Sequence, residues 1–152
     1  MSDTESLPIW DQSFGIGVDI IDCEHKMMLS ALNDFFLSVE LDLGERLSKQ
    51  VFKVLVNYTK SHFENEEQFM GDIGYDLIEQ HRGRHKRFLD RLDDARRLFE
   101  SGRPVRTALV ELVRDFLDRH VAVHDAAIAE FARQLPRAVS QYGRLSDESG
   151  GG

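Results

Sequence analysis

Residues 51–70 read VFKVLVNYTKSHFENEEQFM, and this stretch decides the expected fold. Its apolar residues recur at spacings of three and four, which is the period of one face of an α-helix. The expected inner stripe consists of Val51, Leu55, Tyr58, His62 and Phe69, with their neighbours. Glu66 stands four residues after His62, so the two side chains share a helix face. The stretch therefore predicts a helix that carries an imidazole and a carboxylate on its apolar side.

The same periodicity outside this stretch predicts three more helices. The expected helices span residues 19–43, 45–70, 76–100 and 105–135. Asp19 or Asp22 can cap the first of them and Asp76 the third, while glycines and a proline punctuate the junctions. Because the connections are short, neighbouring helices are expected to pack antiparallel. The predicted fold class is all-α, an antiparallel up-down four-helix bundle.

Two segments are expected to lie outside the bundle. Residues 1–18 contain Trp10 and Phe14 among glycines and a proline, which predicts an irregular arm that packs its aromatic rings on the helices. Residues 137–152 end in Ser-Asp-Glu-Ser-Gly-Gly-Gly, a composition typical of a flexible tail or linker. Residues 1–136 are therefore expected to form a single domain.

Composition narrows the class of protein. The 152 residues carry a formal net charge of −8, with basic residues dispersed among acidic ones, so nucleic acid is not an expected partner. No apolar run approaches the roughly 20 residues that cross a bilayer, and the acidic opening segment does not resemble a signal peptide. Cys23 is the single cysteine, which excludes an internal disulfide and fits a reducing compartment. These features predict a cytoplasmic protein without a membrane partner.

The histidines suggest a metal site. All four expected helices contribute at least one of the six, which are His25, His62, His81, His85, His120 and His124. His81 and His85 are four residues apart and can reach one ion together. Burying several imidazoles with Glu66 among apolar neighbours would be costly unless a metal satisfied them. One cysteine excludes thiolate sites, and imidazole-rich ligands fit calcium or magnesium poorly, so iron, zinc, manganese and copper remain.

Four segments of the sequence resemble the hemerythrin family, and bacteriohemerythrins in particular, over roughly residues 10–130. They are WDQSF with GV and IDCEHK (residues 10–26), HFENEEQFM (62–70), GY leading to His81 and His85 (74–85), and FLDRHV leading to Asp125 (116–125). Their order and their intervals agree with the family pattern. Asp76, Phe116 and Val121 replace a proline, a tryptophan and an isoleucine that are usual there, and none of these departures removes a ligand.

The resemblance implies a pair of non-haem iron ions that bind dioxygen. One ion would be held by His81, His85 and His120 and the other by His25 and His62. Glu66 and Asp125 would bridge the two ions together with an oxide or hydroxide. The ion beside His25 and His62 then has one coordination position open, where dioxygen would bind. Leu117 would line the oxygen pocket, and Phe63, Phe69 and Phe116 are candidates for its apolar wall.

The fourth helix poses a geometric difficulty. On an ideal α-helix His120 and Asp125 point about 140° apart, whereas His120 and His124 share a face. Geometry alone therefore prefers His124 as a ligand, and the family pattern prefers Asp125. A distorted helical turn would reconcile the pattern with the geometry. His124 is then expected to support a ligand or to lie at the surface, with direct metal binding as the alternative.

The leading expectation is an oxygen carrier, store or sensor rather than an enzyme. A di-iron oxidase, peroxidase or nitric oxide reductase is the first alternative, with His124 or Glu67 delivering protons. A second alternative is a sensory domain that controls a fused or separate output partner through the tail. A third is a bundle that binds zinc or no metal. Cys23 lies two residues from His25, on another side of the helix, and is not an expected ligand.

Overall fold

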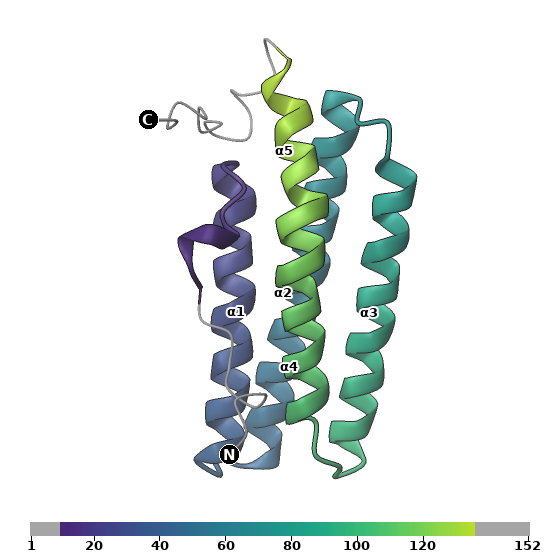
Figure 1. Ribbon diagram of the computed structural model, residues 1–152. Helices are drawn as coiled ribbons and strands as arrows, with labels where there is room; N and C mark the ends of the chain where they lie inside the picture. The colour runs from purple at the N-terminus through teal and green to yellow at the C-terminus, as the bar shows by residue number, and fades with distance from the viewer. Residues whose placement is uncertain (1–9, 136–152) are drawn as a thin grey trace.

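The computed structural model describes residues 10–135, and within them four helical rods form the bundle. The rods run alternately in opposite directions, which confirms the predicted up-down all-α fold (Figure 1). The short 3₁₀ turn η2 (Gln12–Phe14) precedes them. The first three rods are α1 (Asp19–Glu40), α2 (Glu45–Ile73) and α3 (Ile78–Glu100). The fourth rod is continuous and consists of α4 (Arg106–Asp115), the π-helical η3 (Phe116–Asp125) and α5 (Ala126–Arg133).

The ends of the helices differ from the sequence expectation in instructive ways. Helix α2 continues through Gly71 and ends at Ile73, because Gly74 adopts the left-handed conformation at φ 70° and Tyr75 N–H donates to the Met70 carbonyl at 2.9 Å. Helix α3 begins at Ile78, and the residue before it, Leu77, makes no side-chain capping bond. The prediction that Asp76 caps this helix is therefore wrong.

Asp22 forms hydrogen bonds with the N-terminal arm and does not cap α1. Its carboxylate accepts hydrogen bonds from the backbone N–H groups of Ile16, at 2.8 Å, and Gly17, at 3.1 Å. The residue that precedes α1 is Val18, which makes no side-chain capping bond, so the predicted caps Asp19 and Asp22 are both wrong. Trp10 and Phe14 lie half-buried against the core, with ring centroids 5.9 Å apart, as predicted for the arm. The tail 137–152 lies outside the described residues.

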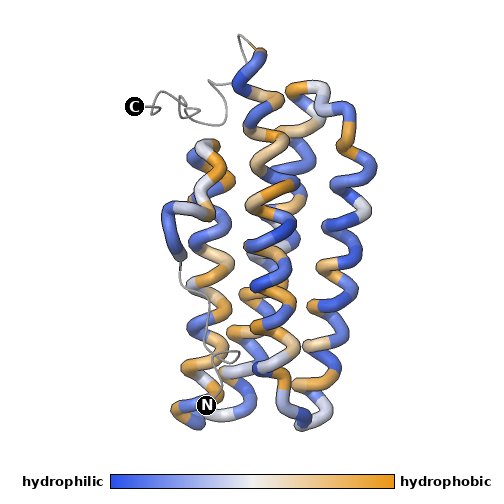
Figure 2. The backbone as a smooth tube through the Cα atoms, viewed as in Figure 1, coloured by the Kyte–Doolittle hydropathy of each residue, from blue (hydrophilic) through white to orange (hydrophobic). Residues whose placement is uncertain are grey.

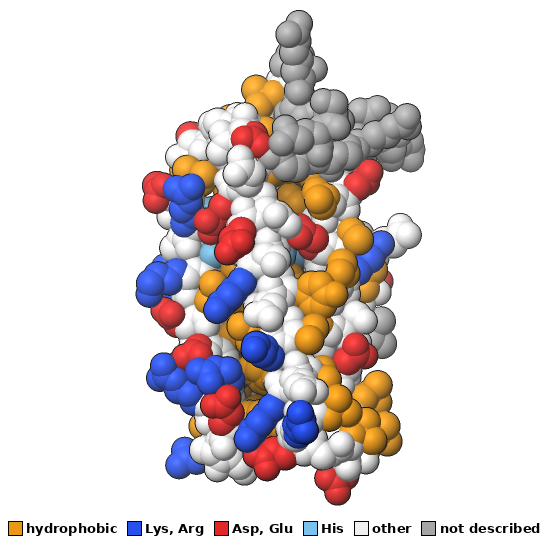
Figure 3. Space-filling view, turned by 180° about the vertical axis from the view of Figure 1, so that it is seen from behind, with side chains coloured by type: hydrophobic (Ala, Val, Ile, Leu, Met, Phe, Trp, Pro, Cys, Tyr) orange, Lys and Arg blue, Asp and Glu red, His pale blue; other side chains and the backbone are white. Residues whose placement is uncertain are grey.

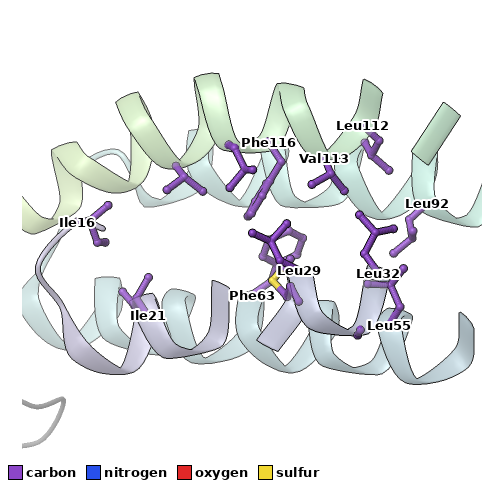
Figure 4. Close-up of a cluster of buried hydrophobic side chains, with 14 of the residues drawn as sticks. Ile16, Ile21, Leu29, Leu32, Leu55, Phe63, Leu92, Leu112, Val113 and Phe116 are labelled. Carbon is purple, nitrogen blue, oxygen red and sulfur yellow. The ribbon is translucent and has the colours of Figure 1, made fainter. Parts of the chain in front are cut away.

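Apolar residues gather on the inner sides of the rods (Figure 2). In Figure 4 the buried apolar side chains of all four rods meet, with Leu29 and Phe63 close to Phe116. The predicted inner position of Tyr58 is wrong, because Tyr58 is 40% exposed and Thr59 is fully buried in its stead. The Thr59 hydroxyl donates to the Leu55 carbonyl at 2.9 Å, so this polar side chain is satisfied inside the helix itself.

The outer surface carries both signs of charge. Figure 3 shows Lys and Arg side chains interleaved with Asp and Glu over the face on which α2 lies. Many of these charges pair along one helix, as do Lys49 with Glu45 at 2.6 Å and Lys86 with Asp90 at 3.1 Å. Among the described helices, none combines the length and the apolar character needed to cross a membrane.

Candidate metal centre

Seven buried side chains from the four rods meet in two overlapping groups. The first group consists of Glu66, His81, His85 and His120, and the second of His25, His62, Glu66 and Asp125. Within each group the possible ligand atoms all lie within 4.8 Å of one another. The structure thus brings together every residue that the sequence resemblance marks as an iron ligand. His124 belongs to neither group and lies half-buried at the surface.

Two carboxylates connect the groups. Glu66 Oε1 lies 2.5 Å from His81 Nε2 and 3.1 Å from His85 Nε2, while Glu66 Oε2 lies 3.2 Å from His62 Nε2. Asp125 Oδ1 lies 3.0 Å from His81 Nε2, and Asp125 Oδ2 lies 3.3 Å from His25 Nε2. Each carboxylate therefore turns one oxygen to each group, which is the arrangement of a bridging ligand between two ions.

The donor atoms are spaced as ligands around a metal are spaced. With metal–ligand distances of about 2.1 Å, neighbouring donors of an octahedron stand about 3.0 Å apart. The donor set consists of nitrogen atoms from five histidines and oxygen atoms from two carboxylates. This combination suits a transition metal. Six buried polar atoms in the described chain lack a hydrogen-bond partner, and all belong to His25, His62, Glu66 and Asp125. Such a concentration of unsatisfied atoms is costly without a cation, so the residues fit a metal pair.

The π-helical segment η3 explains how His120 and Asp125 both face the centre. A π-helix repeats its hydrogen bonds between residues five apart, so these two residues come into register. Ala126, which follows the segment, donates its backbone N–H to the Val121 carbonyl in this pattern. His120 Nε2 consequently lies 3.1 Å from Asp125 Oδ1. The predicted distortion of the fourth helix is present, and it leaves His124 outside the site.

Two further carboxylates lie behind the histidines. Glu24 Oε1 is 3.3 Å from His62 Nδ1, and Glu67 Oε1 is 2.9 Å from His85 Nδ1. A carboxylate at Nδ1 keeps that nitrogen protonated and leaves Nε2 free to bind a metal. The sequence predicts Glu67 only as a possible proton donor and predicts no role for Glu24. The sequence offers only a weak indication of the role of Glu24. This residue is adjacent to His25 in the chain, but its carboxylate contacts His62 on another helix.

In the metal-free site, the buried carboxylates favour protonation of the histidines, and the histidines favour ionisation of the carboxylates. Burial lowers the pKa of His62, but the nearby carboxylates of Glu24 and Glu66 outweigh it and raise this pKa to about 10. Burial likewise opposes the effect of Asp125 and Glu66 on His120, whose pKa rises to about 9. Burial would raise the pKa of Glu66, yet the four neighbouring histidines hold it well below its usual value. The buried carboxylates thus remain ionised and attract either protons or a metal.

A small apolar cavity adjoins His25. Its volume is about 20 Å³, which suffices for one molecule the size of water. Leu117 and Phe116 line it together with residues of α1, α2 and α3. Phe63 and Phe69 are not among its lining residues, and Phe63 instead stacks on the ring of His85 with centroids 3.8 Å apart. Two of the predicted pocket residues thus border the cavity, while Phe63 packs against the three-histidine group.

Comparisons with known proteins agree with this site. The family model named "Hemerythrin HHE cation binding domain" matches residues 16–132. The chain is 28% identical to a bacteriohemerythrin of Stenotrophomonas maltophilia, over 96% of this chain and 92% of that protein. It is 30% identical to a bacteriohemerythrin of Pseudomonas paraeruginosa, over 91% and 92% of the two chains. Myohemerythrin-1 of Phascolopsis gouldii is 27% identical, over 77% and 87%. No solved structure shows a significant match.

Proposed function

The chain belongs to the hemerythrin family, and on that premise we propose that it binds dioxygen reversibly at a non-haem di-iron centre. The observation that carries the proposal is the pair of carboxylates, Glu66 and Asp125, each with one oxygen toward either histidine group. The names of the relatives support the same function, since the three described above are hemerythrins and none is named as an enzyme.

The proposed ligand set divides the histidines unequally. His81, His85 and His120 would hold one iron, while His25 and His62 would hold the other. Glu66 and Asp125 would each offer one carboxylate oxygen to either histidine group. When bound in the ferrous state, the two irons supply the two electrons that a reversible reduction of dioxygen requires. The side with only two histidines, which offers one imidazole fewer, is where dioxygen would bind.

The protein's own contribution is positioning and the exclusion of water. Leu117 and Phe116 surround the cavity beside His25, so dioxygen meets an apolar wall on the two-histidine side. The hydroxyl of Thr59, which also lines the cavity, donates to its own helix and is not free to donate to a ligand. Such a pocket offers no acid or base for turnover and keeps water away from the bound gas. These features favour reversible binding over an oxidase or peroxidase reaction.

Reconstitution with ferrous iron under anaerobic conditions tests the proposal. We expect about two irons per chain, visible charge-transfer bands after exposure to air, and loss of these bands when dioxygen is removed. His62→Ala should lose iron or dioxygen binding. Retention of both, or a single tightly held ion, would overturn the assignment.

The enzymatic alternative is tested on the same sample. Hydrogen peroxide or nitric oxide is added to the reduced protein with excess reductant, and consumption is followed over many equivalents. A binding protein should stop after about one equivalent per di-iron centre, since the cavity beside His25 is lined mainly by apolar side chains that cannot deliver protons for turnover. Sustained consumption would replace the proposed binding function by an enzymatic one.

A further inference from the structure

Arginines line a surface groove between α3 and the fourth rod, which lie side by side in Figure 1. The groove has a volume of about 310 Å³, and its walls include Arg84, Arg87, Arg91 and Arg119. Asp115 is the single carboxylate in the lining. This concentration of positive charge stands out in a chain that has 27 acidic and 19 basic residues.

Three of these arginines have no ionic partner within residues 10–135. Arg91 pairs with Asp115 at 3.3 Å, but no carboxylate of the described chain lies within ion-pair distance of Arg84, Arg87 or Arg119. Other arginines of α3 behave differently, since Arg96 pairs with two carboxylates and Arg97 pairs with Asp93 at 2.9 Å. The unpaired charges are thus a local feature of the groove.

The spacing of the arginines opposes helix stability. Arg84, Arg87 and Arg91 stand at intervals of three and four residues, so their charges lie along one stripe of α3. Like charges at these intervals destabilise a helix. Arg119 faces the same groove from the fourth rod and adds to the repulsion. An anion bound among the four would relieve this repulsion, which Asp115 offsets only at Arg91.

The floor of the groove is aromatic and reaches the metal centre. His120 has 10% of its side chain exposed, whereas the side chains of the other six proposed ligands are at most 2% exposed. Phe116 stacks on His120 with centroids 5.0 Å apart, and the half-buried Phe88 lies 5.0 Å from Phe116. A ligand in the groove would therefore contact apolar rings as well as guanidinium groups.

We propose that this groove binds a small organic molecule that bears a phosphate group. Guanidinium forks match the oxygens of phosphate and form charge-assisted hydrogen bonds with it. The volume lies at the lower end of the range for small-molecule sites and exceeds what one phosphate needs. Phe88 and the edge of His120 are left to receive the organic part. The site rests on the arginines and the aromatic floor of the groove and needs no iron, so its failure would leave the proposed dioxygen function intact.

Isothermal titration calorimetry of the iron-loaded full chain tests the site with three probes: phenyl phosphate, inorganic phosphate and phenol. We expect phenyl phosphate to bind at least about tenfold more tightly than inorganic phosphate, and phenol not to bind measurably. The combined variant Arg84→Gln, Arg87→Gln and Arg119→Gln should weaken phenyl phosphate binding by about a hundredfold, through the loss of charge-assisted bonds.

A second triple variant supplies the control with an equal change of net charge. Arg46→Gln, Arg97→Gln and Arg103→Gln alter arginines that lie outside the groove, and this variant should bind phenyl phosphate within about twofold of the parent. Circular dichroism and iron content establish that both variants are folded. Equal weakening in the two variants, binding that survives in both, or equal affinity for phenyl and inorganic phosphate would each overturn the proposal.

Discussion

Asp125 lies five residues after His120, and the two side chains meet at 3.1 Å because the helix between them has π geometry. In a regular α-helix the same residues would point about 140° apart. The distortion turns the carboxylate into the centre and moves His124 out of it, to a ring distance of 6.1 Å from His120. The choice between the two candidate ligands of this turn is therefore made by the backbone.

Replacing each candidate in turn tests this relationship. Asp125→Ala should retain at most about half of the parent's iron, because both ions of the proposed centre would lose a carboxylate ligand. His124→Ala should retain all of it, since the half-buried imidazole lies in neither group of donor atoms. Iron content is measured by elemental analysis after gel filtration. Iron loss in the His124 variant alone would show that the fourth rod adopts ordinary α-helical register in solution.

The bundle and the four histidine-bearing faces could be predicted from the sequence, because apolar residues spaced by three and four encode an amphipathic helix directly. The composition of residues 116–125 does not signal a π-helix, so the distortion of the fourth rod is predictable only from the conflict between the family pattern and ideal helix geometry. Asp125 was identified by family resemblance alone. Tyr58 was misplaced because Thr59, polar in composition, satisfies its own hydroxyl within the helix and takes the inner position.

The carboxylates that contact the Nδ1 atoms of the histidines could not be predicted from the sequence either. Glu24 and Glu67 matter through contacts with His62 and His85, which lie on other helices. Such pairs depend on how the rods turn about their axes, and helical periodicity fixes this only to within a broad stripe. The cavity beside His25 is likewise a product of packing among all four rods.

Removing the charge behind a ligand should change the redox behaviour of the irons. Glu67→Gln and Glu24→Gln keep an acceptor oxygen for the histidine Nδ1–H but remove a negative charge that stabilises the ferric state. We expect the reduction potential to rise in both variants and the affinity for iron to fall by about tenfold or more. Glu64→Gln, an exposed acid on α2, which also carries Glu67, is the control for the loss of one negative charge. Spectroelectrochemical titration measures the potential, and unchanged potentials in both variants would contradict the positioning role.

Enlarging the cavity beside His25 should make the oxygenated protein autoxidise faster. Leu117→Ala removes a side chain that is 2% exposed and borders a cavity of about 20 Å³, so water can enter beside the open position. We expect autoxidation to accelerate about tenfold or more. Its rate is measured from the decay of the visible bands in air.

The control for this variant must lose similar packing elsewhere. Leu112→Ala lies in the same rod, is also 2% exposed and does not line the cavity. Each variant should lose about 2–5 kcal/mol of stability, as is usual for leucine-to-alanine changes in a core. Equal acceleration in the two variants would show that general loosening, and not the pocket, controls autoxidation.

The stability of the metal-free protein should depend on pH in a way that iron reverses. The pKa of His62, about 10, and of His120, about 9, both exceed the ordinary value of 6.5. A raised pKa contributes stability that is complete below pH 6.5 and is lost as the pH rises through the folded value. The lowered pKa values of Glu66 and Asp125 act in the opposite sense, so their contribution is lost as the pH falls below about 4.

We therefore expect the Tm of the metal-free chain to be highest between about pH 5 and 6.5 and to fall steadily toward pH 10. Iron replaces the protons on the histidine nitrogens, so its stabilising effect should grow over the same interval. Differential scanning calorimetry of the metal-free and iron-loaded forms, in a series of buffers of equal ionic strength, measures both curves. If the two forms lost Tm equally between pH 6.5 and 10, the buried histidines would not be protonated in the metal-free site, and the proposed exchange of protons for iron would be wrong.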